Sequence, residues 1–530
     1  MKRYYRQALL VFLTTLSFGC ARKNFFAKTP VADPAVYQQL KEAPASVDSV
    51  TIQAGKHYKR SGFHNLFWGW HNRALWTAPV TVPVLDIEKE KGGLEIEKLG
   101  GGFQTTSLTL VDKNGFSYAL RSLDKDPVEV LPKIWRKTFV ANIIRDQTSA
   151  INPYGAFIIP PMAEAAAIPH SNPKLVYVHP SDNSFDEHQK LFSDKVFLIE
   201  EKYTNDKSIT PEMGNAKDIV GSEKMLNNRF GKNSHFIDQK AFAKARLFDL
   251  FINDWDRHEG QWDWIEYKED DETIYRPIPK DRDNSFYKFE DGLIPWLFSR
   301  NWAIRKFESF DDEYEDVYAL MINSKFIDER ALNEVTAEEF QELAKELQQA
   351  LTDEVIERAV RQYPQAAYQL VGEKTIRMLK NRRDNLDKAA QEFYKHLAKE
   401  ALVAGTDEDE DFEVKRLNDE ETAVTITRDS DKKQIYHRVF KHSETELITL
   451  HGLAGDDKFK VEGEVNKGIK VVIVGGLGED EIKDTSRVKQ GRKSTYVYDT
   501  KRGTELEGDR ETKDKRTHDV RVHAFDREGF

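Results

Sequence analysis

The sequence predicts a mixed α+β protein that is followed by a small all-β domain. Three observations support this fold class. Residues 101–111 and 116–123 alternate polar and apolar side chains around an Asp-Lys-Asn-Gly turn, which is the pattern of a β-hairpin. Residues 329–400 carry apolar side chains at helical spacing. After residue 412 the chain changes to short alternating segments separated by glycines and paired acids.

Length and composition narrow the classes of function. At 530 residues the chain is too long for one compact core, so two or three domains are expected. Apolar residues make up 39% of the chain, which is enough to fill such cores. The net charge of −11 lacks the basic footprint that a phosphate backbone requires, so we do not expect nucleic acid as a partner.

Residues 1–19 are predicted to be a secretory signal peptide. A basic start precedes an apolar run that is too short to span a membrane. Cys20 is the single cysteine, and the Leu-Ser-Phe-Gly before it resembles a bacterial lipobox. The resemblance implies a lipid on Cys20, a tether over residues 20–60 and a place in the cell envelope, most simply the outer membrane facing the periplasm. An ordinary signal peptide with a chance cysteine is the alternative.

Periodicity assigns the remaining elements in order. Packed structure is expected from residue 62, where aromatic side chains become dense. Thr336 and Glu339 form the pattern of a helix capping box, and the acidic run 404–414 is typical of a linker. The other predicted elements are a helix over 128–150, strands at 155–160, 174–180 and 195–202, a buried helix over 239–252, a hairpin over 263–279 and a long amphipathic helix over 377–402.

Two knots of charged residues flank the predicted hairpin. The first is FINDWDRHEGQWDWIEY, residues 251–267, and the second is PIPKDRDNSF, residues 277–286. Acids and arginines in a loop often do no more than pair with each other and with backbone amides. Their spacing also suits phosphoryl transfer, which needs a carboxylate base, a metal-binding amide and further metal-binding carboxylates. Asp281 and Asp283 are alternate residues, so both can reach one metal.

This order of motifs resembles the catalytic core of the atypical kinases. That group includes the spore-coat protein kinases, the HipA-type toxin kinases, the secretory-pathway kinases and the phosphoinositide kinases. The resemblance covers about residues 95–300 and implies a two-lobed kinase-like domain with a helical C-terminal lobe, binding ATP or another nucleotide with Mg²⁺ or Mn²⁺. Together with the segments assigned above and the alternating segments after residue 412, the predicted domains are a signal peptide (1–19), a lipidated tether (20–60), an α+β N-terminal lobe (61–202), a helical C-terminal lobe (203–403), an acidic linker (404–414) and an all-β domain (415–530).

The resemblance also implies roles for single residues. Asp256 corresponds to the catalytic base, and the hairpin that covers the nucleotide is rich in glycine. Arg257 and His258 are expected to brace the loop, with His258 as an alternative base. The implied metal ligands are Gln261, Asp281 and Asp283. The implied nucleotide-binding residues are Gly100, Gly101, Gly102, Arg121 and Lys125.

Three departures from the kinase pattern leave a second hypothesis open. Gln261 stands in the place of the usual asparagine. Arg121 replaces the usual lysine, and arginine is not a conservative substitute at a phosphate site. The helix at 128–150 offers no clear glutamate as an ion-pair partner, and Asp146 is the nearest acid. A catalytically silent accessory lipoprotein that binds an envelope or outer-membrane protein explains the same residues.

The segments after residue 412 suggest repeated rungs. ELITLHGLAGDDKFKVEG and IKVVIVGGLGEDEIKDTS each place a strand before glycine and paired acids, which predicts a short β-helix or a sandwich. The second repeat resembles a calcium-binding β-roll, which implies Ca²⁺ at Asp456, Asp457, Asp480 or Asp484; acids that solvate turns are the alternative. Motifs such as FWGWHNRALWTAPV and DWDRHEGQW also resemble a family of uncharacterised Bacteroidetes envelope proteins.

Overall fold

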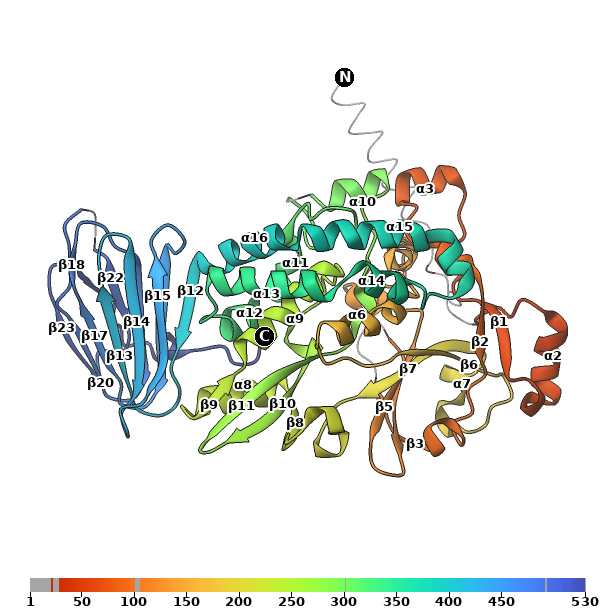
Figure 1. Cartoon of the computed structure of the whole chain (residues 1–530), viewed down its shortest axis with the longest axis horizontal. Coiled ribbons are helices and arrows are strands. Elements are labelled where there is room, and N and C mark those ends of the chain that lie inside the picture. Colours follow the sequence, from red (N-terminus) through yellow and green to blue (C-terminus); the bar gives the residue numbers. More distant parts are fainter. Residues whose placement is uncertain (1–20, 22–27, 101–104, 301, 491–492, 530) are drawn as a thin grey trace, which may run out of the picture.

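The computed structural model describes residues 21, 28–100, 105–300, 302–490 and 493–529. Figure 1 shows helices layered above two β-sheets, with a separate β domain, drawn in blue, at one end. The mixed α+β class and the β-rich C-terminal region agree with the sequence prediction. Within these residues, none of the helices has the length and apolar content needed to cross a membrane.

Residues 28–60 are folded, which corrects the expectation of a tether. Strand β1 pairs antiparallel with β2 and buries Val50 and Ile52. Asp33 caps helix α2, whose first residue is Pro34. Only two apolar residues of β1 point to the core, and the surrounding residues are polar. The sequence pattern was therefore too short to predict a strand. The elements here are α2 (Pro34–Glu42), β1 (Ser49–Gln53), α3 (Gly62–Trp68), α4 (Arg73–Thr77) and β2 (Pro79–Pro83).

A five-stranded antiparallel sheet in the order β3-β4-β5-β7-β6 lies within the segment predicted to be the N-terminal lobe. The predicted hairpin is present as β4 and β5, with Ser107 opposite Arg121. Of the helix predicted over 128–150, only α5 is α-helical. The predicted strand at 155–160 is instead helical, because Pro160 opens α6. The bounds are β3 (Leu94–Gly100), β4 (Ser107–Asp112), β5 (Ser117–Ser122), α5 (Phe139–Gln147), α6 (Pro160–Ala165), β6 (Lys174–Val178), α7 (Gln189–Phe192) and β7 (Lys195–Lys202).

A second sheet, in the order β8-β10-β11-β9, carries the two charged knots. Its central strands are the predicted hairpin, and the buried helix expected before it is α9. Helix α9 has nearly every side chain from Phe242 to Phe251 buried, which explains its weak amphipathic pattern. The bounds are β8 (Asp218–Gly221), α8 (Ser222–Gly231), β9 (His235–Ile237), α9 (Gln239–Phe251), β10 (Trp262–Glu269), β11 (Glu272–Pro279) and α10 (Leu293–Phe298).

The helical segment packs over this second sheet and shares one apolar core with it. The capping box is confirmed, because Thr336 Oγ1 accepts from Glu339 N–H and the Glu339 carboxylate accepts from Thr336 N–H. The helix predicted over 377–402 is split at Asn385 and ends before a strand. The bounds are α11 (Val317–Met321), α12 (Lys325–Ala331), α13 (Ala337–Ala350), α14 (Asp353–Val360), α15 (Gln365–Asp384) and α16 (Leu386–Ala398).

The β domain is a short parallel β-helix, one of the two architectures predicted. Successive strands of each face pair in parallel, for example Leu447 with Lys470 and Asp480 with Thr504. The antiparallel strands β14 and β15 are inserted into the first rung. The bounds are β12 (Glu400–Ala404), β13 (Glu410–Arg416), β14 (Glu421–Arg428), β15 (Gln434–Lys441), β16 (Leu447–Ala454), β17 (Lys458–Glu462), β18 (Glu464–Val465), β19 (Lys470–Leu477), β20 (Asp480–Asp484), β21 (Arg487–Val488), β22 (Thr495–Tyr498), β23 (Thr504–Gly508) and β24 (Thr512–Asp514).

The acidic segment 404–414 is part of this β-helix rather than a linker. Glu410 begins β13 and is buried, with both carboxylate oxygens accepting hydrogen bonds from Thr406. The C-terminal tail returns to the helical lobe, where Phe525 packs against Phe230. The acidic composition of residues 404–414 indicated solvent-exposed side chains, so it did not predict that Glu410 is buried.

The repeated acids connect one rung of the β-helix to the next. Asp457 Oδ1 accepts from Glu410 N–H at 2.9 Å, and Asp480 Oδ1 accepts from Asp457 N–H at 3.1 Å. A glycine is needed a few residues before the acid, because a Cβ on Gly452 would lie 2.2 Å from Asp457 Oδ2. Among the described residues, no group of three or more His, Cys, Asp or Glu side chains is placed to hold a metal ion, so the calcium expectation gains no support.

Replacing Asp457 with asparagine is expected to stabilise the β domain at alkaline pH. Burial and the nearby Glu410 raise the pKa of Asp457 to about 9. Between the unfolded pKa and this value the native state keeps a proton that the unfolded chain has lost, so stability falls as pH rises. Asparagine removes this loss and still offers an oxygen to Glu410 N–H. Asp457→Asn should match the wild type near pH 5 and exceed it by roughly 4 kcal/mol near pH 8.

Denaturant unfolding at several pH values measures this difference. The matched control is Asp456→Asn, because Asp456 accepts from Glu479 N–H at 2.9 Å in the same way but is exposed. The control should show the pH dependence of the wild type. Parallel stability curves for Asp457→Asn and the wild type would contradict the prediction.

Candidate functional site

The β10–β11 hairpin brings the two charged knots together. Trp262 pairs with Pro279 at its open end, so residues 254–261 enter the hairpin where residues 280–284 leave it. Lys280 N–H donates to Gln261 O at 3.1 Å, which continues the ladder into the loops. Antiparallel pairing alone therefore explains why segments more than 20 residues apart share one site.

Arg257 holds the first loop in shape. Its buried guanidinium donates to Lys280 O at 2.7 Å, to Gln261 O at 3.0 Å and to Asp249 Oδ2 at 3.1 Å. Because all three contacts are internal, the structure places Arg257 as a brace. His258 turns elsewhere, with Nδ1 accepting from Gly260 N–H at 3.1 Å and its ring lining an open cavity of about 650 Å³.

Asp256 is half-buried and held by two amides. Asn284 Nδ2 donates to its Oδ2 at 3.2 Å, and Asn323 Nδ2 donates to its Oδ1 at 2.9 Å. Both oxygens are therefore fixed by neutral donors, and none of the described ion pairs involves this carboxylate. Asn284 belongs to the second knot, so this bond also ties the two loops to each other.

Cations from the N-terminal sheet meet carboxylates from the second knot. Arg121, on β5, lies 2.8 Å from Asp281 through Nη1 and also pairs with Glu200 on β7. Lys125, just after β5, lies 2.6 Å from Asp283. Asp281 adopts a left-handed conformation with φ of +56°, which starts a tight 3₁₀ turn and aims both acids toward the sheet. Two ion pairs thus join the first sheet to the segment that follows β11.

The two acids have opposite electrostatic surroundings. Burial raises the pKa of Asp281, but Arg121 and Lys125 outweigh it and bring that pKa to about 2. Burial and the charge of Asp281 raise the pKa of Asp283 to about 6. Each acid keeps a buried Oδ1 that has no hydrogen-bond partner among the described residues. Unpaired carboxylate oxygens are the donors that Mg²⁺ prefers, and it usually takes one or two carboxylates together with substrate phosphates.

Other predicted site residues are placed less directly. Gly100 ends β3, whereas Gly101 and Gly102 lie outside the described residues, as does Cys20. Gln261 is half-buried, and its described bonds are those of its backbone. Asp146 does not pair with Arg121 or Lys125, because its carboxylate binds the two arginines of the preceding segment instead, Arg60 and Arg73. Glu200 takes the place that Asp146 was expected to fill.

Besides Glu200, three residues of the site were not predicted. Asn284 and Asn323 hold Asp256, and Asp249 on α9 binds Arg246, Arg257 and Arg282. Asn284 was visible within the second knot. Asn323 lies about seventy positions from Asp256 and no local pattern marks it.

Comparison with known proteins identifies no family. No family model matches the chain, and no curated protein matches it. A solved structure of the proinflammatory kinase CtkA from Helicobacter pylori is similar over 54% of this chain and 93% of that chain, with 11% sequence identity and a TM-score of 0.29. Identity and TM-score this low assign neither fold nor family, so the geometry of the site has to support any functional proposal.

Proposed function

We propose that this protein is a kinase-like envelope lipoprotein that binds a nucleotide or related phosphate ligand with a divalent metal and transfers its phosphoryl group. The observation that carries the proposal is the meeting of Arg121 and Lys125 with Asp281 and Asp283 across the two lobes. Cations suit phosphate oxygens, and the carboxylates suit the metal that neutralises them. A lipid on Cys20 and an outer-membrane position complete the proposal.

The ligand would replace the present ion pairs. Arg121 and Lys125 would turn from the acids to phosphate oxygens, and the two carboxylates would be free for a metal. Asp281 and Asp283 fit Mg²⁺ or Mn²⁺ because each has a buried oxygen that pairs with nothing in the described part of the chain. The metal, when bound, would neutralise charge on the phosphates and align them. Lys125 is only 7% exposed, so its charge acts in a water-poor setting where it is strongest.

Asp256 supplies the proton acceptor in this proposal. An acceptor hydroxyl would lie against the carboxylate, which takes its proton as the oxygen bonds to phosphorus and the leaving phosphate departs with the electron pair. Asn284 and Asn323 fix the carboxylate before the substrate arrives, which is the positioning that phosphoryl transfer depends on.

A silent binding protein is the second candidate. The observation that favours it is the pairing itself, because a site filled by its own ion pairs resists ligand entry. Arg121 is also paired with Glu200, and under this hypothesis that second pair keeps it away from a phosphate. Under this hypothesis the lobes and the β-helix hold an envelope protein partner, and the charged site is structural.

Thermal unfolding with nucleotides separates the two candidates. The chain from residue 21 onward contains every described element, and it would be heated with ATP, GTP or ADP, with and without Mg²⁺ or Mn²⁺. Ligand binding at a hundredfold excess over Kd stabilises by about 2.7 kcal/mol, so a metal-dependent rise in melting temperature is expected. Asp281→Ala should abolish that rise. If no combination of nucleotide and metal changes the melting temperature, the kinase proposal is wrong and the binding-protein hypothesis is favoured.

A matched control shows that the loss is local. Asp238 is a half-buried acid that pairs with Arg276 at 3.0 Å on the outer side of the same sheet. Asp238→Ala should keep the nucleotide-dependent shift even if the basal melting temperature falls. Equal loss of the shift in both variants would show general damage rather than a ligand site.

A further inference from the structure

Exposed aromatic side chains gather on two short segments. Phe63 of α3 is 77% exposed, Trp70 just beyond it is 53% exposed, and Trp302 after α10 is 67% exposed. Soluble proteins seldom expose large apolar side chains together unless the surface contacts something. This α3–α10 surface is made by Phe63, Leu66, Trp70, Trp296, Phe298 and Trp302.

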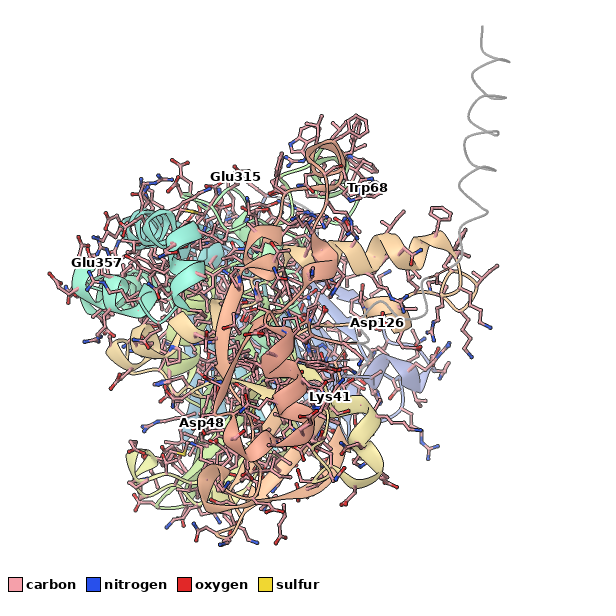
Figure 2. All side chains as sticks on the ribbon, turned by 90° about the vertical axis from the view of Figure 1, so that its right-hand side faces the viewer. Lys41, Asp48, Trp68, Asp126, Glu315 and Glu357 are labelled. Carbon is pink, nitrogen blue, oxygen red and sulfur yellow. The ribbon has the colours of Figure 1, made fainter. Side chains whose placement is uncertain are left out.

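The two helices form one preformed unit. The backbones of Gly69 and Gly292 touch so closely that a Cβ on Gly292 would lie 2.2 Å from Gly69 N. His71 N–H donates to Asp291 Oδ2 at 2.7 Å beside this contact. Figure 1 shows α3 and α10 side by side at the top of the molecule, and Trp68, the last residue of α3, is at the top in Figure 2 as well. The surface is thus a fixed projection of the fold.

A basic and apolar segment lies one helix away. Residues 133–137 read Lys-Ile-Trp-Arg-Lys, and Ile134 is 76% exposed. Helix α5 follows this segment, and its Asp146 lies 3.1 Å from His64 of α3. The segment and the α3–α10 surface therefore sit at the two ends of α5.

The beginning of the mature chain meets the same segment. Ala21 N–H donates to Lys137 O at 3.1 Å. Cys20 is covalently bonded to Ala21, and consecutive Cα atoms are about 3.8 Å apart. A lipid carried by Cys20 would therefore begin beside residues 133–137. The hydrogen bond between Ala21 and Lys137 therefore places the exposed apolar residues near the membrane that would hold the anchor.

We propose that the α3–α10 surface and residues 133–137 rest together on an anionic lipid bilayer. Tryptophan and phenylalanine rings favour the boundary between headgroups and acyl chains. Lys133 and Lys137, both exposed, suit anionic headgroups. The anchor on Cys20 determines only which membrane is reached, so the surface itself is testable without lipidation and independently of the nucleotide site.

Co-sedimentation with vesicles tests this surface directly. The unlipidated chain from residue 21 onward would be mixed with vesicles of phosphatidylethanolamine and phosphatidylglycerol, or of phosphatidylcholine alone. We expect binding to the anionic vesicles. Burial of one large apolar side chain contributes enough for roughly a tenfold change in partitioning, so Trp70→Ser combined with Trp302→Ser should weaken it about 100-fold.

Exposed positions make these variants safe for folding, and unchanged melting temperatures would confirm it. The matched control is Leu477→Ser, which removes a side chain that is 60% exposed on the distant β-helix and should leave binding unchanged. Absence of vesicle binding, or equal binding by the double variant, would overturn the proposal. A concentration-dependent dimer in sedimentation velocity that the double variant dissolves would assign the surface to a second copy of the chain instead.

Discussion

Replacing Asp256 with asparagine is expected to lower the rate of phosphoryl transfer at least about 100-fold while nucleotide affinity stays the same. Asparagine has nearly the same shape and can still accept one of the hydrogen bonds from Asn284 or Asn323. It cannot take the proton of an acceptor hydroxyl. Loss of rate without loss of binding is the signature of a group that acts in the transition state.

Metal-dependent ATP hydrolysis by the chain from residue 21 onward, together with nucleotide Kd, measures both quantities. Asp218→Asn is the matched control, because Asp218 forms a partly exposed pair with Lys224 at 3.2 Å and should leave the rate unchanged. Asn323→Ala tests positioning: it should lower the maximal rate by about tenfold with little change in KM. A wild-type protein that binds nucleotide without turnover would contradict the proposed transfer while leaving nucleotide binding standing.

Local patterns explain how far the sequence predicted this site. The β10–β11 hairpin was predictable because strand alternation and a short turn are local signals, and the hairpin places Asp256 near Asp281. The partners of those acids were not local. Arg121 and Lys125 entered only through a family resemblance, although the structure does bring both cations to the predicted acids.

The errors share one physical cause, which is tertiary packing that overrides local propensity. The segment at 155–160 reads as a strand because it is apolar, yet it is helical and places Ile158 and Ile159 in the core. Residues 28–60 look like a tether because their polar side chains outnumber the few that reach the core. Acids at 404–414 look solvated, but Gly405 makes room to bury Glu410, as Gly452 does for Asp457 in the next rung.

Replacing Asp249 with alanine is expected to cause the largest loss of stability, about 3–5 kcal/mol. Asp249 is fully buried and touches Arg246, Arg257 and Arg282 at 3.0–3.1 Å. Arg246 would keep Asp328 as a partner at 2.8 Å. Arg282 has no other carboxylate among its described ion pairs, so alanine would leave a buried charge without compensation. Such a charge costs more than a lost contact, because it is also cut off from water.

Urea unfolding of the wild type and the variant measures this difference in stability. Asp312→Ala is the control, because Asp312 pairs with Arg377 at the surface. Its loss should destabilise the protein by less than about 1 kcal/mol. Asp249→Asn should fall between the two, because an amide still accepts a hydrogen bond but carries no charge. Arg257 braces the Asp256 loop, and Arg282 lies between Asp281 and Asp283 in the sequence. Because Asp249 binds both arginines, it contacts both charged segments. Folded Asp249→Asn should therefore also lose part of the nucleotide-dependent rise in melting temperature. A variant that is destabilised but keeps the full rise would show that Asp249 stabilises the fold without positioning the site.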